Sequence, residues 1–319
     1  MSTPSSWSSH LQQCVLDACL LEVRSAKPGN VTPDQSFADI SVVDFERSAK
    51  AVSAVLQEAD RQSVGVSILR SIQATRRVVE SNTNLGIVLL LAPLATVPAG
   101  QSLSNGILSV LEALSVQDAA DTFEAIRLAS PAGLGEAESQ DVAQAPTETL
   151  RQCMSLAAER DLIARQYHDG FQGVLQQGLT WLQQTAGWQE HHPLRVAFVA
   201  LQLMQQSGDS LIARKMGEQA SRDVARRAAD VLASDWPAGE IGRKRFAEFD
   251  AYLRSDGNRL NPGTTADMIA AILFAALRDR LIIPTAQSTS FRFVDQDAAY
   301  SQPYVSRRPP GKLPHVQTV

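Results

Sequence analysis

Apolar residues recur at helical spacing along most of the chain. Leu11, Val15, Ala18 and Leu21, for example, fall on one face of a helix over residues 11–24. Comparable patterns predict helices over residues 43–59, 64–80, 87–94, 103–114, 116–128, 147–168, 171–185, 194–206, 220–234, 243–254 and 267–281. No internal repeat and no alternating strand pattern is evident. The sequence therefore predicts an all-α fold, a single globular multi-helix bundle of about ten to twelve helices with irregular polar loops lining a central pocket.

The two ends of the chain depart from this pattern. Residues 1–8 are rich in Ser and Pro, which predicts a flexible N-terminus. Residues 284–319 contain several prolines and show no helical period, which predicts an irregular C-terminal tail. No long linker interrupts residues 9–283, so we expect them to form one all-α domain.

Composition narrows the class of protein. Hydrophobic residues make up 44% of the chain and aromatic residues 6%, which suits a helical protein with a substantial core. The net charge of −5 gives no indication of a nucleic-acid surface. The three cysteines lack the spacing of metal ligands, and neither a signal peptide nor a membrane-spanning apolar run is evident. We therefore expect a cytoplasmic protein that binds small molecules, without a nucleic-acid or membrane partner; the sequence leaves homo-oligomer formation open.

One stretch joins a polar turn directly to a strongly apolar helix. Residues 256–265 contain two glycines, a proline and several hydroxyl or amide side chains, whereas residues 267–281 are largely Ala, Ile, Leu, Met and Phe. The junction places the unpaired N–H groups and partial positive charge of a helix N-terminus at the edge of a core, where proteins commonly bind phosphate. Asn261 and Pro262 also fit an ordinary helix cap, which is the simpler interpretation of this stretch taken alone.

Four other segments have a similar polar or glycine-rich character: residues 27–30, 81–86, 130–136 and 209–217. Lys27 follows a helix on a proline-stiffened bend, where its ammonium could meet a phosphate and Gly29 would allow a close approach. Asn82, Thr83 and Asn84 supply donors and acceptors that suit ribose or base edges. A solvated lysine and a simple helix cap are the alternatives.

Charged side chains flank these segments. Arg214 and Lys215 lie outside the three- or four-residue spacing from Asp209 that makes helical neighbours, so they are free to face a ligand. Four carboxylates also lie near the loops: Glu22, Asp39, Asp209 and Asp267. Carboxylates beside a phosphate would repel it unless Mg²⁺ lay between them. The alternatives are a pair of solvated cations and, for Asp209, a helix cap.

Standard catalytic motifs are absent. The chain contains no GxGxxG, GxxxxGK[ST], GxSxG or HExxH pattern, which argues against dinucleotide, P-loop, hydrolase-elbow and zincin sites. His191 and His192 are adjacent, a spacing that does not let both bind one ion from a single helix face.

In its ordered set of loops the chain resembles the family of ATP:dephospho-CoA triphosphoribosyltransferases, the triphosphoribosyl-dephospho-CoA synthases. The resemblance rests on Glu22-Val23 with Lys27-Pro28-Gly29, on Asn82-Thr83 with Gly86, on residues 133–136 and on residues 261–267. The chain departs from the family pattern at three positions. Phe37 and Asn84 stand where the family has histidines, and Leu85 stands where it has a lysine.

The resemblance implies an all-α transferase that moves the triphosphoribosyl group of ATP to a ribose hydroxyl of dephospho-CoA or a related acceptor, with release of adenine. This is a pentosyl transfer with ATP as substrate and Mg²⁺ as cofactor. Glu22 and Asp267 are the predicted catalytic residues. The predicted substrate-binding residues are Lys27, Gly29, Asn82, Thr83, Asn84, Gly86, Glu136, Arg214, Lys215, Asn261, Gly263 and Thr264. The predicted metal ligands are Asp39, Asp209 and Asp267.

Three alternatives stay open at this point. The chain could act on another phosphorylated nucleotide-like substrate, hydrolyse a phosphate ester, or serve as a non-catalytic helical scaffold. The transferase hypothesis requires that Lys27, Asn82, Arg214 and Asp267, which are far apart in the sequence, line one cavity.

Overall fold

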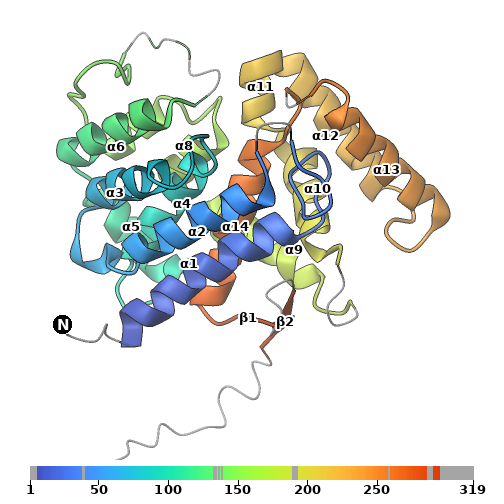
Figure 1. Cartoon of the computed structure of the whole chain (residues 1–319), viewed down its shortest axis with the longest axis horizontal. Helices are drawn as coiled ribbons and strands as arrows, with labels where there is room; N and C mark the ends of the chain where they lie inside the picture. The colour runs from blue at the N-terminus through green and yellow to red at the C-terminus, as the bar shows by residue number, and fades with distance from the viewer. Residues whose placement is uncertain are drawn as a thin grey trace, which may run out of the picture.

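A single apolar helix forms the centre of the fold. The computed structural model describes residues 6–37, 40–131, 135, 137, 139–188, 193–257, 259–285 and 290–294. Helix α14 (Gly263–Arg278) is rich in strong helix formers, and every residue from Met268 to Arg278 is buried. Because it is apolar on all sides, it is surrounded by other helices (Figure 1).

The N-terminal half of the chain packs on one side of α14. It consists of α1 (Ser6–Arg24), α2 (Val42–Leu56), the 3₁₀ turn η1 (Ala59–Arg61), α3 (Val64–Arg76), α4 (Leu85–Thr96), α5 (Leu103–Glu112) and α6 (Val116–Ala129). Helices α1 and α4 contact α14 directly, and α2, α3 and α6 build outward from them. Asp118 fixes one of these contacts, since it caps α6 and also accepts a hydrogen bond from the N–H of Gly65 in α3 (2.8 Å).

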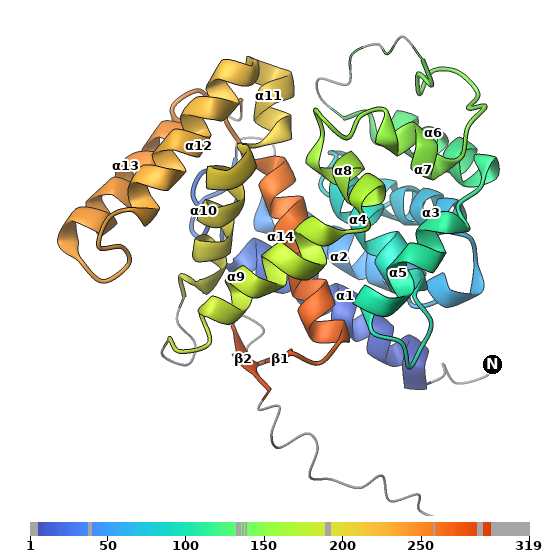
Figure 2. The ribbon, with the colours of Figure 1, turned by 180° about the vertical axis from the view of Figure 1, so that it is seen from behind.

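The remaining helices either cover the other sides of α14 or pack outside the helices that do. They are α7 (Leu150–Ser155), α8 (Leu162–Asp169), the π-helical turn η2 (Gly173–Gly178), α9 (Leu179–Gln184), α10 (Arg195–Ser207), α11 (Ser210–Met216), α12 (Glu218–Leu232) and α13 (Glu240–Arg254). Helix α9 crosses α14 on the face shown in Figure 2, and α12 and α13 form a hairpin that projects to one side. In the part of the chain that the structure describes, no helix combines the length and apolar character needed to cross a bilayer.

The predicted all-α fold is confirmed, with fourteen α-helices among the described residues rather than ten to twelve. The helix predicted over residues 147–168 is wrong as one element: it is divided into α7 and α8, because Asp161 caps α8 and starts a new helix. The segment at residues 209–217, for which no helix was predicted, forms α11, and Asp209 is its cap. Helix α1 begins at Ser6, inside the segment predicted to be flexible.

A short β-hairpin also departs from the prediction. Strands β1 (Ile282–Pro284) and β2 (Phe291–Phe293) pair antiparallel, with Ile282 opposite Phe293. Arg195 holds the second strand, since its guanidinium donates to the carbonyl of Phe291 (3.1 Å) and lies over the rings of Phe291 and Phe293. A strand this short leaves too few residues for an alternating pattern to be recognised in the sequence.

Candidate active site

The N-termini of three helices meet beside the first turn of α14. Gly86, the second residue of α4, lies so close to Asp267 of α14 that an added β-carbon would overlap the Asp267 carboxylate. The same β-carbon would also press against Ile163, at the start of α8. Since a helix N-terminus carries partial positive charge, the starts of α4, α8 and α14 together favour an anion at this point.

Asp267 is the carboxylate at the centre of this junction. It is partly buried, and its side chain makes no hydrogen bond or ion pair with any described residue. Burial raises the pKa of Asp267 well above its ordinary value, and the charges of Glu22 and Asp209 raise it further, while Arg214 opposes the shift. The site therefore contains an acid that stays protonated to a higher pH than a solvated aspartate would.

Glu22 and Lys27 form a buried ion pair beside it. Glu22 Oε1 lies 3.2 Å from Lys27 Nζ, and the two side chains are only 3% and 2% exposed. Lys27 Nζ also donates to the carbonyl oxygens of Ser25 (3.1 Å) and Glu22. Burial raises the pKa of Glu22, and Lys27 partly offsets that rise. The ammonium that was predicted to meet a phosphate thus has three protein acceptors and neutralises Glu22.

The turn after Lys27 is fixed to the C-terminal helices. Gly29 has a left-handed φ of 71°, and its N–H donates to Asp250 Oδ1 in α13 (2.7 Å). Arg254 donates to the carbonyl of Asn30 (2.7 Å), and the Asn30 amide donates to the carbonyl of Pro262 (3.4 Å). Two loops that are more than 200 residues apart in the sequence therefore lie side by side.

The polar run before α4 is mostly turned inward. Asn82 is exposed, and its side-chain oxygen accepts from the N–H of Leu85 (3.1 Å). Thr83 is hydrogen-bonded to Ser48 (2.5 Å), and the Asn84 amide donates to Thr75 (2.9 Å). The Asn84 side-chain oxygen is buried and has no partner among the described residues. Only Asn82 of the three is thus presented to solvent.

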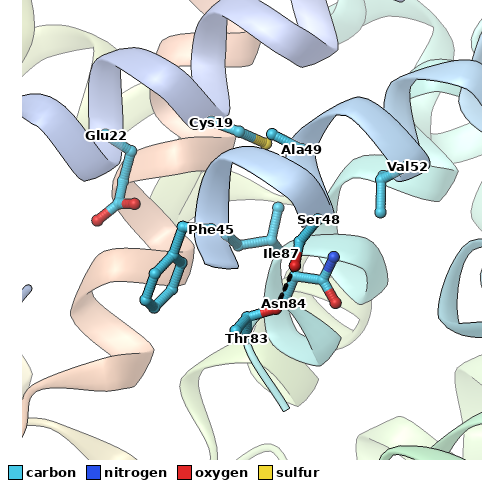
Figure 3. Close-up of a pocket in the computed structure, with 9 residues that line it drawn as sticks. All are labelled: Cys19, Glu22, Phe45, Ser48, Ala49, Val52, Thr83, Asn84 and Ile87. Atoms are coloured by element: carbon cyan, nitrogen blue, oxygen red, sulfur yellow. Dashed lines mark hydrogen bonds between the residues drawn. The ribbon is translucent and has the colours of Figure 1, made fainter. Parts of the chain in front are cut away.

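A small cavity lies against this run. Its lining includes Glu22 and Cys19 of α1, Ser48 of α2, and Thr83 and Asn84 (Figure 3). Its volume is about 10 Å³, which suits one water molecule. The expected central pocket of nucleotide size is therefore not formed at this position, although Asn82 and Arg214 are exposed.

Asp209 ties α11 to α14. Its Oδ1 accepts from the N–H groups of Leu211 (2.9 Å) and Ile212 (3.1 Å), and its Oδ2 accepts from the N–H and hydroxyl of Thr265 (both 2.8 Å). Four hydrogen bonds occupy this carboxylate, so the helix-cap interpretation describes it well. Its role as a metal ligand stays a prediction.

Arg214 reaches from α11 to α8. Its guanidinium lies 3.2 Å from Asp161 Oδ2, and its side chain is 34% exposed. Asp161 Oδ1 meanwhile caps α8 by accepting from Ile163 (2.9 Å) and Ala164 (3.1 Å). Lys215 is partly buried on the same helix.

The other predicted residues have varied positions. Thr264 is buried, Gly263 packs against Leu211, and the buried side-chain oxygen of Asn261 has no partner among the described residues. Asp39 and Glu136 lie outside the described residues, as does most of residues 133–136. Within the described ranges, no group of three or more His, Cys, Asp or Glu side chains is arranged to hold a metal ion.

The structure thus brings together Glu22, Gly86, Asp209, Arg214 and Asp267, with Lys27 beside them but turned inward. Asp161 belongs to the same group and was missed. A signal for it existed, because Asp161-Leu162-Ile163-Ala164-Arg165 closely matches Asp209-Ser210-Leu211-Ile212-Ala213-Arg214. Each segment is an Asp cap followed by a short helix.

The fold and the site together define an all-α protein with an acidic centre at converging helix N-termini. A model of the CitG family, ATP:dephospho-CoA triphosphoribosyl transferase, matches residues 8–284, and the chain belongs to this family. Among solved structures, a candidate triphosphoribosyl-dephospho-CoA synthase from Archaeoglobus fulgidus is similar with a TM-score of 0.58 and 26% identity, over 73% of this chain and 97% of that one. A comparison with curated proteins found no match.

Family membership confirms the resemblance predicted from the loops. The chain is a transferase of a family that uses ATP, and the scaffold alternative is not favoured. The three departures from the family pattern remain, and the structure shows what one of them does: Leu85 is 6% exposed and packs in the core, in a position where a lysine ammonium would be buried.

Proposed function

We propose that the chain transfers the triphosphoribosyl group of ATP to a ribose hydroxyl of dephospho-CoA or a closely related acceptor, with release of adenine. The observation that carries the proposal is Asp267, an unpaired carboxylate with a raised pKa at the junction of three helix N-termini. Family membership supports ATP as the donor. The pentosyl-transfer chemistry and the acceptor are the parts that need testing.

Asp267 is suited to the general base of this reaction. The acceptor hydroxyl oxygen forms a bond to C1′ of the ATP ribose as the C1′–N9 bond to adenine breaks. Asp267 takes the hydroxyl proton, and adenine leaves with the bonding electron pair and gains a proton from water. A carboxylate with a raised pKa is a stronger base once it is deprotonated, which suits this role. Its negative charge would also stabilise positive charge that develops at C1′.

Glu22 is better suited to tuning Asp267 than to taking the proton itself. It is buried and paired with Lys27, so its carboxylate is not free to contact a substrate hydroxyl. Its charge nevertheless contributes to the raised pKa of Asp267. We therefore assign the base to Asp267 and an electrostatic role to Glu22.

The triphosphate is expected to lie on the open side of the junction. The starts of α4, α8 and α14 offer N–H groups and partial positive charge, and Arg214 adds a partly exposed guanidinium. Asn82, exposed at the start of α4, is placed to contact the ribose. Lys215 is the second cation on α11, and Lys27 would have to leave Glu22 to take part.

Among the described residues, few carboxylates are available to Mg²⁺. Mg²⁺ in nucleotide sites is commonly held by one or two carboxylates together with phosphate oxygens. Asp267 has oxygen atoms without a partner among the described residues, but it is assigned here to the base, and the oxygens of Asp209 are already occupied. Asp39, outside the described residues, is the second predicted ligand. When bound, the ion would supply charge neutralisation between the carboxylates and the triphosphate.

The test is product analysis by mass spectrometry after incubation with ATP, MgCl₂ and dephospho-CoA. We expect free adenine and an acceptor heavier by one triphosphoribosyl group. Asp267→Asn should reduce the rate at least 100-fold, whereas Asp60→Asn, at a carboxylate in η1 outside the candidate site, should not change it. Release of phosphate without adenine would instead identify a hydrolase, and absence of ATP binding in calorimetry with Mg²⁺ would contradict the proposal.

A further inference from the structure

A second cleft lies at the far end of α8. Its volume is about 730 Å³, within the range of small-molecule sites. It is formed by α7, the end of α8 and the segment before α7, and Gln140, Arg151, Gln152, Ser155, Leu156 and His168 line it. None of these residues belongs to the group around Asp267.

The cleft is connected to the candidate active site by one face of α8. Asp161, Arg165 and His168 are spaced by four and three residues, so they lie along the same side of the helix. Asp161 holds Arg214 beside Asp267, and His168 lines the cleft. Seven residues of helix span about 10 Å. Both ribbon views show α8 between α11 and α6 (Figures 1 and 2).

The chemistry of the cleft suits an uncharged chain with amide groups better than a triphosphate. Gln152 and His168 are exposed polar side chains, and Leu156 offers an apolar side chain that is 54% exposed. Arg151 donates from Nε to the carbonyl of Tyr167 (3.3 Å), and its terminal nitrogens have no partner among the described residues. Glu148, which also lines the cleft, would repel a highly charged anion.

We propose that this cleft binds the pantetheine arm of the acceptor, with the outer face of α8 leading to it from Asp267. The inference rests on the proposed function, which places the acceptor ribose at Asp267. The arm continues from the 5′-diphosphate and is rich in amides. The diphosphate would pass Arg151, and the arm would pack on Leu156 and bond to Gln152. The cleft thereby selects an acceptor that carries an arm over a plain nucleotide.

Leu156→Trp tests the proposal, since a larger side chain at this exposed position narrows the cleft where the arm would pack, without disturbing the core. Ile241→Trp is the matched control, at an apolar residue of α13 that is 62% exposed. Calorimetry with the full chain should show dephospho-CoA binding at least tenfold weaker to Leu156→Trp than to wild type or Ile241→Trp. ATP binding should be unchanged in all three. 4′-Phosphopantetheine, which has the arm without the nucleoside, should bind wild type and not Leu156→Trp.

Two outcomes would overturn the cleft assignment: unchanged dephospho-CoA binding by Leu156→Trp, or an equal loss of ATP binding. These are separable from failure of the proposed function. If dephospho-CoA binds through the cleft but no adenine is released, the cleft assignment is supported and the proposed transfer reaction is contradicted. If adenine is released and Leu156→Trp does not change the KM for dephospho-CoA, the transfer reaction is supported and the cleft assignment is contradicted.

Discussion

Gly86 of α4 and the carboxylate of Asp267 in α14 are in such close contact that no β-carbon fits between them. The absence of a side chain at position 86 therefore sets where the Asp267 carboxylate lies. It also lets the N-terminus of α4 approach the start of α14 closely. Gly86 is thus explained by packing against a functional group, not by an unusual backbone conformation.

Gly86→Ala should lower the activity of the protein without lowering its stability. The new methyl group would push the flexible end of Asp267 aside, which relieves the overlap but misplaces the carboxylate by about 1 Å, a displacement that can cost roughly 100-fold in rate. Alanine is a better helix former than glycine by about 1 kcal/mol, which offsets the strain. We expect kcat to fall about 100-fold with a nearly unchanged melting temperature. Gly187→Ala, where a β-carbon meets nothing, is the control; equal kcat values for the two variants would contradict the role of Gly86.

Asp267→Asn should make the protein more stable at high pH while removing activity. Because the pKa of Asp267 is raised in the folded state, the folded protein keeps this proton at pH values where the unfolded chain has lost it. Stability from this group is therefore present at low pH and is lost as pH rises through the raised pKa. Thermal melts across pH 4 to 9 should show that the melting temperature of Asp267→Asn rises relative to that of wild type as pH increases. A constant difference between the two proteins at every pH would count against the raised pKa.

The sequence allowed the fold class and part of the site to be predicted. Lys27, Gly86 and Asp267 could be selected because they stand in polar or glycine-rich turns next to apolar helices, a pattern visible without coordinates. Which of them face a ligand could not be predicted, because that depends on partners far away in the chain. Lys27 is turned inward by Glu22 and by two carbonyls, and only the folded backbone brings those acceptors together.

Asp161 was not selected from the sequence, because the pattern around it concealed its role as a helix cap. Its segment has helical periodicity on both sides, so the pattern predicted one continuous helix and hid the cap. Strong local periodicity is a weak guide to where a helix stops, since an Asp in the middle of a periodic run can end one helix and begin another. The similar segment at Asp209 begins after a glycine, which made its cap visible.

Disruption of the buried pair of Glu22 and Lys27 should destabilise the protein strongly. Lys27→Met leaves the Glu22 carboxylate buried without its cation, which typically costs about 3 to 5 kcal/mol. The double variant Glu22→Gln/Lys27→Met removes both charges and should recover part of that loss. Urea unfolding of the two single variants and the double variant measures the coupling. Arg226→Gln, which breaks an exposed pair with Asp223, should cost less than about 1 kcal/mol; a similar cost for Lys27→Met would contradict the importance of burial.

Substitutions of Arg214 and of Asp161 should shift the pH dependence of the reaction in opposite directions. The charge of Arg214 lowers the pKa of Asp267, and that of Asp161 raises it. A general base acts when deprotonated, so kcat/KM should rise with pH through the pKa of Asp267. Arg214→Gln should move this rise to higher pH and, by removing a phosphate contact, weaken ATP binding by about tenfold or more. Asp161→Asn keeps an oxygen that can cap α8 but loses the charge, so the rise should move to lower pH.

Profiles of kcat/KM for both variants, with Arg226→Gln as the surface control, measure the two shifts. Shifts of the same sign, or none in either variant, would mean that another group is the base.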